Sequence, residues 1–338
     1  MPSFKVVITD FSHPDQDIEA AELRAAGLDV QLIRLNIRLP EQLIPHVVDA
    51  DALMVQWATI NRQVIEALTR CKVIARYGIG VDMVDLQAAS ERGIPVANVP
   101  DFCVEEVSTH TVAFILMLNR HVLLHHQHVR AGKWDGVPGG APSRLVGQTL
   151  GIVGLGNIGR AVARKAGCLG LQLLAYDPYV SQEAAHELGV CLVELADLLR
   201  RSDYVSLHCP LNEETRHLIG AEELALMKPT AYLINMARGP IVDQRALYQA
   251  LSGGTIRGAA LDVLDQEPPA PDEPLLQLEN VIFTPHTSSW SAESLVQLRR
   301  DTARNVAMAL QGRLPRSIVN RRALGLDESR QDRVLRSP

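Results

Sequence analysis

The chain has 338 residues, of which 47% are hydrophobic and 21% are charged, and its formal net charge is -6. This length favours two domains over one, and the interspersed charges form no basic patch that would suit nucleic acid or an anionic membrane. Because no apolar run reaches the length of a membrane span and residues 1–10 lack a secretory apolar core, we expect a cytoplasmic protein that acts on a small molecule. The cysteines are odd in number and form no CxxC pair, so we interpret as reduced thiols Cys71, Cys103, Cys168, Cys191 and Cys209.

The first hundred residues predict a small unit of alternating strands and helices. Short apolar runs rich in valine and isoleucine indicate buried strands, and apolar residues at helical spacing indicate a helix over 18–26. A glycine-rich loop at 76–82 follows one of these runs. The predicted strands of this unit are 5–9, 30–35, 52–55, 72–75 and 94–99.

Two helical patterns and a connector follow this unit. Residues 105–118 predict a long apolar helix, and residues 121–133 continue at helical spacing with more polar side chains. Residues 136–147 are rich in glycine and proline and predict a connector. His121 and His125 share a helix face, but no carboxylate or cysteine is placed to complete a metal site with them, so we predict no metal.

The most informative motif begins where the apolar run 150–153 gives way to the sequence GLGNIG. Gly154 permits a tight turn off the strand, Gly156 lets backbone N–H groups approach a pyrophosphate, and Gly159 lets the next helix pack closely on the strand. That helix directs its positive end at phosphate. Strand, turn and helix together predict a dinucleotide site whose pyrophosphate lies over Gly156, Asn157 and Ile158.

Asp177 closes the next predicted strand, 171–176, about 20 residues beyond the glycine turn. A carboxylate there accepts hydrogen bonds from the ribose hydroxyls of NAD and repels the 2′-phosphate of NADP, so we predict NAD as the cofactor. An aspartate followed by Pro178 is also typical of a simple turn, and the two interpretations are compatible.

Beyond Asp177 the alternation of strands and helices resumes. The apolar runs suit a parallel sheet that is covered on both faces, and ligands bind such sheets at the carboxyl ends of the strands. A helix is predicted over 292–310, and we expect the polar residues 327–338 to fray. The predicted strands of this part are 204–207, 231–235, 258–264 and 281–284.

A cation, a carboxylate and an imidazole follow the ends of these strands, at Arg238, Glu267 and His286. Reduction of a 2-oxo acid by hydride needs a cation that polarises the substrate and an acid that protonates the developing alkoxide. Arg238 can supply the cation and His286 the proton, while Glu267 accepts the other N–H of the imidazole. Each residue alone also has a structural interpretation, as a turn cap, a loop start and a core histidine.

Six motifs stand in order along the chain: GLGNIG at 154–159, YDPY at 176–179, LHCPLNEETRHLI at 207–219, NMARGPIVD at 235–243, GAALDVLDQEP at 258–268 and TPH at 284–286. Together they resemble the D-isomer-specific 2-hydroxyacid dehydrogenase family, and the resemblance extends from about residue 5 to about residue 320. It implies that Arg238, Glu267 and His286 are the catalytic set of an NAD-dependent enzyme. The implied reaction interconverts a small 2-oxo acid and its D-2-hydroxy acid.

The resemblance also implies an α/β fold of two Rossmann-like, doubly wound parallel-sheet domains, with the nucleotide domain inserted into a split substrate domain. We assign 1–101 and 290–325 to the substrate domain, 102–289 to the NAD-binding domain and 326–338 to a polar tail. The active site would lie in the cleft. The family also implies a homodimer through the helix around 105–130, although the apolar pattern there would equally suit a core helix.

Within the family the chain is most similar to the C-terminal-binding-protein-like branch, through RYGIGVD at 76–82, GIPVANVP at 93–100 and VEE at 104–106. This similarity implies that Arg76 meets the substrate carboxylate, with help from the backbone N–H groups of Ile79 and Gly80. An arginine that faces water at a strand end is the alternative. Trp57 is the fourth residue that we expect at the substrate.

Further cofactor contacts are implied along the strand ends, with Asp262 at the nicotinamide end. They complete a predicted cofactor set that adds to the glycine turn and Asp177 the residues Cys209, Pro210, Thr215, Met236, Ala237, Asp262, His286 and Ser289.

The chain departs from the family pattern at four positions. Met83 stands where the family often has asparagine, and Val107 replaces a threonine near the cofactor. Trp290 stands four residues after the histidine instead of three, so we expect an altered pocket. Gln56 lies in the loop where phosphoglycerate dehydrogenases present an arginine to the substrate phosphate, which makes phosphoglycerate a poor candidate.

Two other functions fit parts of the sequence. An NAD(H)-sensing protein that recruits a partner, as a corepressor does, would use the same fold with weak dehydrogenase activity. The complete catalytic set argues for retained catalysis. Formate or phosphite oxidation is a third interpretation, and the absence of a long N-terminal extension argues against formate.

Overall fold

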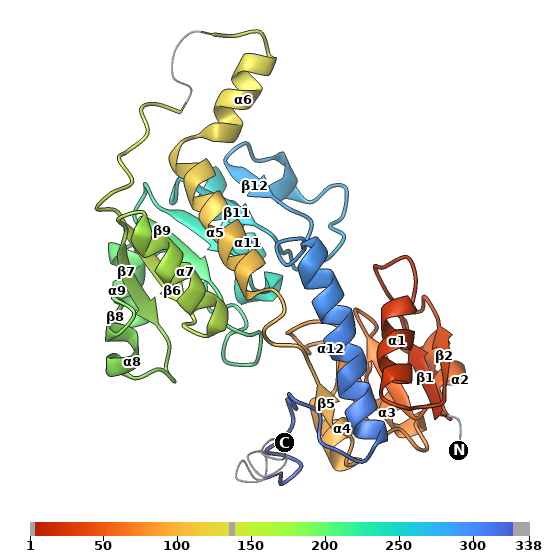
Figure 1. Cartoon of the computed structure of the whole chain (residues 1–338). Coiled ribbons are helices and arrows are strands. Elements are labelled where there is room, and N and C mark those ends of the chain that lie inside the picture. The colour runs from red at the N-terminus through yellow and green to blue at the C-terminus, as the bar shows by residue number, and fades with distance from the viewer. Residues whose placement is uncertain (1–3, 135–138, 327–338) are drawn as a thin grey trace. The chain divides into compact units, whose positions relative to one another are not determined.

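The computed structural model describes residues 4–134 and 139–326. The chain divides into two compact units, one formed by 1–102 with 291–338 and the other by 103–290 (Figure 1). Each unit is a parallel sheet with helices on its faces, so the predicted fold class is confirmed. Most of the predicted tail, residues 327–338, and the residues 135–138 of the predicted connector lie outside the described residues.

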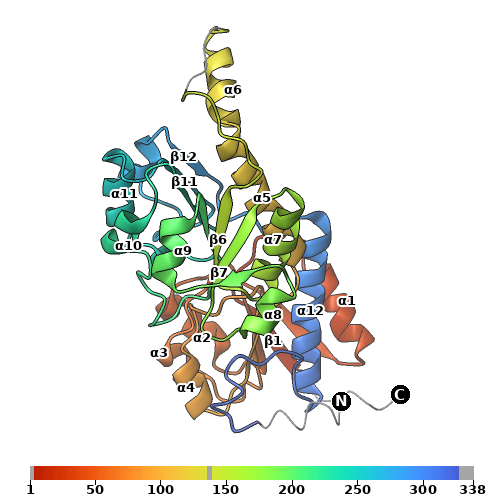
Figure 2. The same ribbon diagram turned by 90° about the vertical axis from the view of Figure 1, so that its left-hand side faces the viewer.

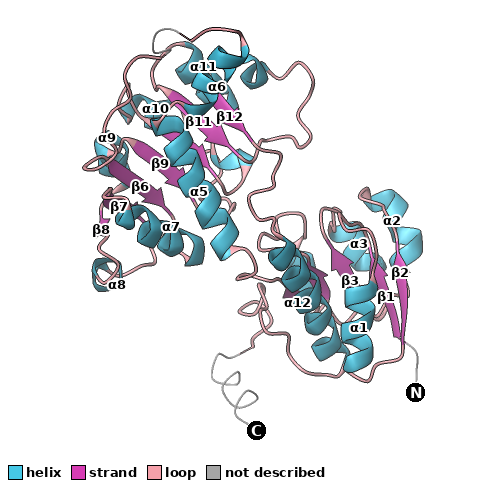
Figure 3. Ribbon diagram, turned by 45° about the horizontal axis from the view of Figure 1, so that its top comes forward, coloured by secondary structure: helices cyan, strands magenta, loops and turns pink. Residues whose placement is uncertain are grey.

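The first unit is built on a five-stranded parallel sheet in the order β2-β1-β3-β4-β5. Figure 3 shows β2, β1 and β3 side by side. Its central strand, β3, is apolar and wholly buried, because helices cover both faces of the sheet. The strands are β1 (Phe4–Ile8), β2 (Val30–Arg34), β3 (Ala52–Val55), β4 (Ile74–Arg76) and β5 (Val96–Ala97).

Five helices cover this sheet. Two of them, from opposite ends of the sequence, pack against each other, and the other three bury small and branched apolar side chains against the other face. The first pair is α1 (Asp17–Ala25) and α12 (Ala292–Leu310), and the other three are α2 (Pro40–Val47), α3 (Arg62–Ala67) and α4 (Leu86–Glu91) (Figure 1).

A buried ion pair joins α1 to α12. Nε of Arg299 donates to Oε1 of Glu19 at 2.9 Å and Nη2 donates to Oε2 at 2.7 Å, while the hydroxyl of Tyr77 donates to the same carboxylate at 3.1 Å. Glu19 has no exposed surface and Arg299 is buried. Because an unpartnered charge in such a place is costly, α12 completes the charge balance of the N-terminal segment.

The second unit has a seven-stranded parallel sheet in the order β12-β11-β10-β9-β6-β7-β8. The central strands are apolar runs buried on both faces, and a large core of leucine, isoleucine and valine fills the space between sheet and helices. The strands are β6 (Thr149–Val153), β7 (Gln172–Tyr176), β8 (Cys191–Leu192), β9 (Tyr204–Leu207), β10 (Tyr232–Asn235), β11 (Gly258–Leu261) and β12 (Val281–Phe283).

The helices of the second unit lie on both faces of its sheet (Figure 2). Two of the longest, α5 and α7, pack side by side. The α-helices are α5 (Val104–Asn119), α6 (Val122–Arg130), α7 (Asn157–Cys168), α8 (Gln182–His186), α9 (Leu195–Arg201), α10 (Ala221–Leu226) and α11 (Gln244–Ser252), and two short 3-10 turns are η1 (Gly239–Ile241) and η2 (Pro274–Gln277).

Helices α5 and α6 are separated by a sharp bend of 60° at His121. This residue has a φ of 52°, in the left-handed region, so the helical spacing predicted to continue over 121–133 is interrupted there and α6 ends at Arg130. None of the described helices is by itself long and apolar enough to cross a membrane. The bent pair α5 and α6 meets that test by length and composition only.

The predicted strand 258–264 was also too long, since β11 ends at Leu261. The backbone N–H of the next residue, Asp262, still donates to the carbonyl of Asn235 at 3.1 Å, and its carboxylate bonds the loop that follows β12.

Candidate active site

The carboxyl ends of six strands in the second unit are level. Pairing along the sheet places in one row Tyr176, Val153, Leu207, Asn235, Leu261 and Phe283. The residue after each strand therefore begins the same edge of the sheet. That edge gathers, from distant parts of the sequence, Gly154, Asp177, His208, Met236, Asp262 and Thr284.

The glycine turn begins at this edge. Gly154 has a φ of 94°, and a Cβ there would lie 2.7 Å from the backbone nitrogen of Cys209. A Cβ on Gly159 would lie 2.2 Å from the carbonyl oxygen of Gly154, so the helix and the turn can touch only without a side chain. Close contacts within the protein therefore explain why both positions are glycine.

Gly156 is different, because a Cβ there would meet nothing within 4 Å. It is the N-cap residue of α7 and supplies no side-chain cap to the first N–H groups of this 12-residue helix. This is the arrangement that an anion needs at a helix N-terminus. The turn thus fits the pyrophosphate of a dinucleotide, with Asn157 and Ile158 in the first helical turn.

Asp177 follows β7 at the same edge and is held by two backbone N–H groups. Its Oδ2 accepts from the backbone N–H of Leu155 at 2.8 Å and its Oδ1 accepts from that of Tyr179 at 2.9 Å. The carboxylate is partly exposed, so its remaining lone pairs can accept from a ribose diol. The hydroxyl of Tyr179 donates to Glu214 at 3.2 Å, which links this loop to the segment after β9.

The segment after β9 contains the predicted residues Cys209, Pro210 and Thr215. Thr215 stabilises it, because its hydroxyl donates to the carbonyl of Pro210 at 2.6 Å. Burial raises the pKa of the Cys209 thiol to about 11, so this thiol is neutral at physiological pH. Burial also lowers the pKa of His208 to about 3, and its neutral ring contacts Ser206 at 2.8 Å.

The turn after β10 presents Met236, Ala237 and Arg238 at the edge. The side-chain amide of Asn235 donates to the carbonyl of Arg238 at 2.8 Å and accepts from the N–H of Ala237 at 3.0 Å. A Cβ on Gly239 would lie 2.1 Å from the backbone carbon of Leu264. The turn after β10 therefore lies directly against the loop after β11, in which Glu267 stands.

Asp262 is buried and holds the loop that follows β12. Its Oδ1 accepts from the hydroxyl of Thr284 at 2.5 Å and from the N–H of Thr287 at 2.9 Å, and its Oδ2 accepts from the N–H of Ser288 at 3.1 Å. This carboxylate orients the segment on both sides of His286. Contact with the nicotinamide, which we predict for Asp262, would come in addition to this role.

Glu267 and His286 form the pair that the sequence predicts. Nδ1 of His286 lies 2.6 Å from Oε2 of Glu267, and Oε1 of Glu267 accepts from the N–H of Leu264 at 3.1 Å. Within the described residues Nε2 of His286 has no protein partner, and both side chains remain about one-third exposed. The imidazole is therefore held through one nitrogen and can offer the other to a substrate.

The electrostatics of the pair favour an ionised carboxylate. Burial raises the pKa of Glu267, but the hydrogen bond and the charge of His286, the N–H of Leu264 and the charge of Arg238 together lower it below its ordinary value of 4.5. The backbone of His286 has a φ of 52°, and its N–H donates to the carbonyl of Asp262 at 2.8 Å. The edge thus combines an oriented imidazole, an ionised carboxylate and a guanidinium.

The four predicted substrate residues belong to the first unit, at the carboxyl edge of its own sheet. Arg76 ends β4 and is buried, and its guanidinium occupies the space where a Cβ of Gly78 would lie. Next to it, the side chain of Asn98 donates to the carbonyl of Ile79 at 2.7 Å and fixes the glycine-rich loop that also holds Gly80. Trp57 follows β3, the neighbour of β4.

Several residues that shape these edges were not predicted. Asp10, which has no exposed surface, accepts from the N–H groups of Gln56, Trp57 and Ala58 at 3.1, 2.7 and 3.1 Å. Thr284 lies 3.3 Å from Nε2 of His110 as well as bonding Asp262. The only sequence signal for these roles is their place directly after, or one residue after, an apolar strand.

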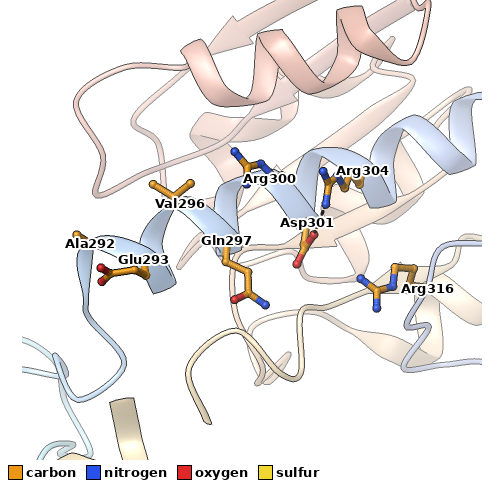
Figure 4. A pocket seen from close by; sticks show the side chains of 8 residues that line it. All are labelled: Ala292, Glu293, Val296, Gln297, Arg300, Asp301, Arg304 and Arg316. Atoms are coloured by element: carbon orange, nitrogen blue, oxygen red, sulfur yellow. Dashed lines mark hydrogen bonds and ion pairs between the residues drawn. The ribbon is translucent and has the colours of Figure 1, made fainter. Parts of the chain in front are cut away.

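A groove along α12 contains none of the predicted residues (Figure 4). Its cationic side chains are largely paired, because Arg300 contacts Glu22 at 2.9 Å and Arg304 contacts both Glu22 and Asp301, at 3.0 and 3.2 Å. We assign it no ligand. Among the described residues, no group of three or more histidine, cysteine or acidic side chains is arranged to hold a metal ion, and all five cysteines are free thiols.

A comparison with protein families matches residues 112–288 to the family described as "D-isomer specific 2-hydroxyacid dehydrogenase, NAD binding domain". A glyoxylate reductase of Korarchaeum cryptofilum is 43% identical over 82% of this chain and 85% of its own length. A D-3-phosphoglycerate dehydrogenase of Methanocaldococcus jannaschii is 39% identical over 94% of this chain, but the chain spans only 59% of that relative.

Solved structures agree with this result. The D-lactate dehydrogenase of Aquifex aeolicus, complexed with NAD and lactic acid, superimposes with a TM-score of 0.84 at 29% identity, over 93% of this chain and 99% of that one. The glycine turn, the open space at Gly156 and the partly exposed Asp177 fit the same cofactor. The dinucleotide that the second unit binds is therefore NAD.

Proposed function

Because the chain belongs to the D-isomer-specific 2-hydroxyacid dehydrogenase family, we propose that it interconverts a small 2-oxo acid and the corresponding D-2-hydroxy acid with NAD(H). The observation that carries the proposal is the 2.6 Å contact between His286 and Glu267 at the edge that also bears the glycine turn. Arg238 stands on the neighbouring turn. An NAD site alone would not require this oriented imidazole.

In the proposed mechanism each residue handles one charge. The hydride that reduces the carbonyl carbon would come from NADH held at the glycine turn and Asp177. The guanidinium of Arg238 polarises the carbonyl oxygen, and Nε2 of His286 delivers the proton to the developing alkoxide. Glu267 stabilises the imidazolium through Nδ1 and fixes the ring orientation. Arg76 binds the substrate carboxylate.

The substrate that we propose is a small 2-oxo acid. A relative named D-3-phosphoglycerate dehydrogenase is 39% identical to this chain and one named glyoxylate reductase is 43% identical, so the names of the relatives do not choose the substrate. Gln56, in the loop where we expect the phosphate-binding arginine of phosphoglycerate dehydrogenases, is turned to Ser12, accepting from its N–H at 2.8 Å and donating to its hydroxyl at 2.8 Å. This position therefore supplies no charge to a phosphate.

The direct test is oxidation of NADH by the purified protein, followed at 340 nm with glyoxylate, pyruvate, hydroxypyruvate, 2-oxobutyrate and phenylpyruvate. We expect saturable turnover with at least one acid, and lower kcat/KM when NADPH replaces NADH. Tight NADH binding without turnover on any 2-oxo acid would contradict the proposal and favour an NAD(H)-sensing protein that recruits a partner.

Cofactor selection can be tested separately at Asp177. The substitution Asp177→Asn removes the charge but keeps one oxygen for the N–H of Leu155. We expect NADH to bind about 5- to 10-fold more weakly. The ratio of the affinities for NADH and NADPH should also fall, because the 2′-phosphate is no longer repelled. Fluorescence titration of the protein with each nucleotide measures both effects. If the ratio of the affinities for NADH and NADPH did not change, Asp177 would not be the residue that selects the cofactor.

Two further predictions concern the protein in the cell. We propose a homodimer through α5 and α6, because α6 has no buried residue and leaves Val122 and Val129 nearly half exposed. Light scattering of the wild-type chain and of Val129→Glu compares the masses. The cytoplasmic location predicted from the sequence stays a prediction.

A further inference from the structure

Arg38 stands on the loop that leaves β2, at the carboxyl edge of the five-stranded sheet. The backbone fixes its position, since the N–H of Ile37 donates to the carbonyl of Thr9 at 2.9 Å and the N–H of Thr59 donates to the carbonyl of Arg38 at 3.0 Å. The side chain then extends over the neighbouring loop. Its guanidinium carbon lies 4.6 Å from the centre of the Trp57 ring.

These contacts position the guanidinium of Arg38 but do not involve all of its hydrogen-bond donors. Its side chain is 52% exposed, and only Nε approaches a carboxylate, at 3.7 Å from Oδ2 of Asp10. That carboxylate already accepts from the hydroxyl of Thr9 and from three backbone N–H groups of the loop 56–58. Among the described residues, the two terminal nitrogens of Arg38 donate to no protein acceptor.

Stacking on an aromatic ring orients a guanidinium at little cost to its charge. The contact with the indole of Trp57 restrains the guanidinium, so its two terminal nitrogens lose less entropy when they bind an anion. The side-chain amide of Gln56 is hydrogen-bonded to Ser12, so it does not compete with Arg38 for an anion. Arg38 is therefore the cationic side chain that lies over the loop of Trp57.

The register of the sheet relates Arg38 to Arg76. Val55 at the end of β3 pairs with Arg76 at the end of β4, and neighbouring strands lie about 4.8 Å apart. Because the guanidinium of Arg38 lies over Trp57, two residues beyond Val55, both arginines stand at the carboxyl edge of the five-stranded sheet. Two cations there match a substrate that has an anionic group at each end.

Resting on the proposed function, we propose that Arg38, stacked on Trp57, binds a second carboxylate at the far end of the substrate. The preferred substrates are then four- or five-carbon 2-oxo dicarboxylates. The two terminal nitrogens of one planar fork match the two oxygens of a carboxylate. A phosphate dianion would keep one negative charge that Arg38 alone does not balance.

The test compares two substrates that differ only in the distal carboxylate, 2-oxopentanedioate and 2-oxopentanoate. We expect the wild-type protein to have the higher kcat/KM with the dicarboxylate. In Arg38→Gln, the ratio of the two kcat/KM values should fall by about 10- to 100-fold, the loss of a charge-assisted bidentate contact. Arg38→Lys keeps the charge without the planar fork and should give an intermediate ratio.

Arg24→Gln is the matched control, since it removes an exposed arginine from the last turn of α1 in the same unit, and its ratio should equal that of the wild type. A ratio that does not change in Arg38→Gln overturns the inference while leaving the proposed reductase intact. So does a preference of the wild type for 2-oxopentanoate, or for 3-phosphohydroxypyruvate over hydroxypyruvate. Failure of the wild type on every 2-oxo acid instead contradicts the proposed function itself.

Discussion

Each of the two sheets holds a functional loop at its carboxyl edge with one buried aspartate. In the first unit Asp10 accepts from three consecutive N–H groups and thereby fixes the loop of Trp57. In the second unit Asp262 accepts from the N–H groups of Thr287 and Ser288 and fixes the loop of His286. Under the proposed function, the same device would support substrate recognition in one unit and proton transfer in the other, so equivalent substitutions should have different kinetic effects.

The largest effect should come from the imidazole that Asp262 orients. In His286→Ala the substrate alkoxide loses its proton donor, and we expect kcat to fall by roughly 10²- to 10⁴-fold. NADH binding should change little, because the glycine turn and Asp177 remain. Steady-state kinetics combined with NADH titration measure both quantities. Turnover within tenfold of wild type would remove His286 from its proposed role.

The next effect should come from Asp262→Asn. The amide keeps one acceptor oxygen but loses the charge that bonds Thr284 and the two N–H groups. The loop of His286 should then shift, and misplacement by about 1 Å can lower kcat by up to 10²-fold. A rise in KM alone, with kcat retained, would contradict the comparison, since it would show that this aspartate serves substrate binding.

Asp10→Asn is the matched substitution in the first unit. We expect KM for the 2-oxo acid to rise by about 3- to 10-fold with a smaller change in kcat, because in the proposed function the loop of Trp57 contacts substrate without moving a proton. Circular dichroism and urea unfolding must accompany the kinetics, because Asp10 is wholly buried. A folded variant that loses kcat and keeps KM would show that both edges serve chemistry.

The smallest effect concerns pH and stability. The pKa of Glu267 is lower in the folded protein than its ordinary value of 4.5. Its ionised form therefore contributes to the stability of the fold at pH values above 4.5, and this contribution is lost as the pH falls through the lowered pKa. Because both side chains are about one-third exposed, we expect Glu267→Gln to cost less than about 1 kcal/mol at pH 7. Urea unfolding of both proteins at pH 7 and pH 4 should show that difference shrinking in acid. If the difference in unfolding free energy between the two proteins grew in acid, the predicted direction of the pH dependence would be wrong.

The sequence predicted most of the strands, and it predicted that Arg238, Glu267 and His286 follow strand ends, because both depend on short-range patterns. Apolar runs followed by polar residues located the edge that bears Arg238, Glu267 and His286. The glycine turn was equally readable, since Gly154 and Gly159 are required by backbone contacts within the motif. In such places local chemistry and tertiary structure require the same residue.

Other features depend on contacts between distant residues, which periodicity does not record. Asp10 bonds a loop 46 to 48 residues away, and Arg38 reaches Trp57 only because β2 and β3 flank β1. The break at His121 was missed because helical spacing of side chains continues through it while one φ becomes positive. Helices of five to seven residues, such as α8 and α9, have too few turns for a clear period.

The ion pair of Glu19 with Arg299 has a consequence for synthesis on the ribosome. The two residues are 280 positions apart, and the whole second unit is translated between them. That unit is one continuous stretch and can fold as soon as it emerges. The nascent N-terminal segment, by contrast, has to wait with α1 uncovered and Glu19 without its guanidinium until α12 is made. A chaperone that meets this protein during translation should therefore find its first hundred residues, and not the dinucleotide fold, still unfinished.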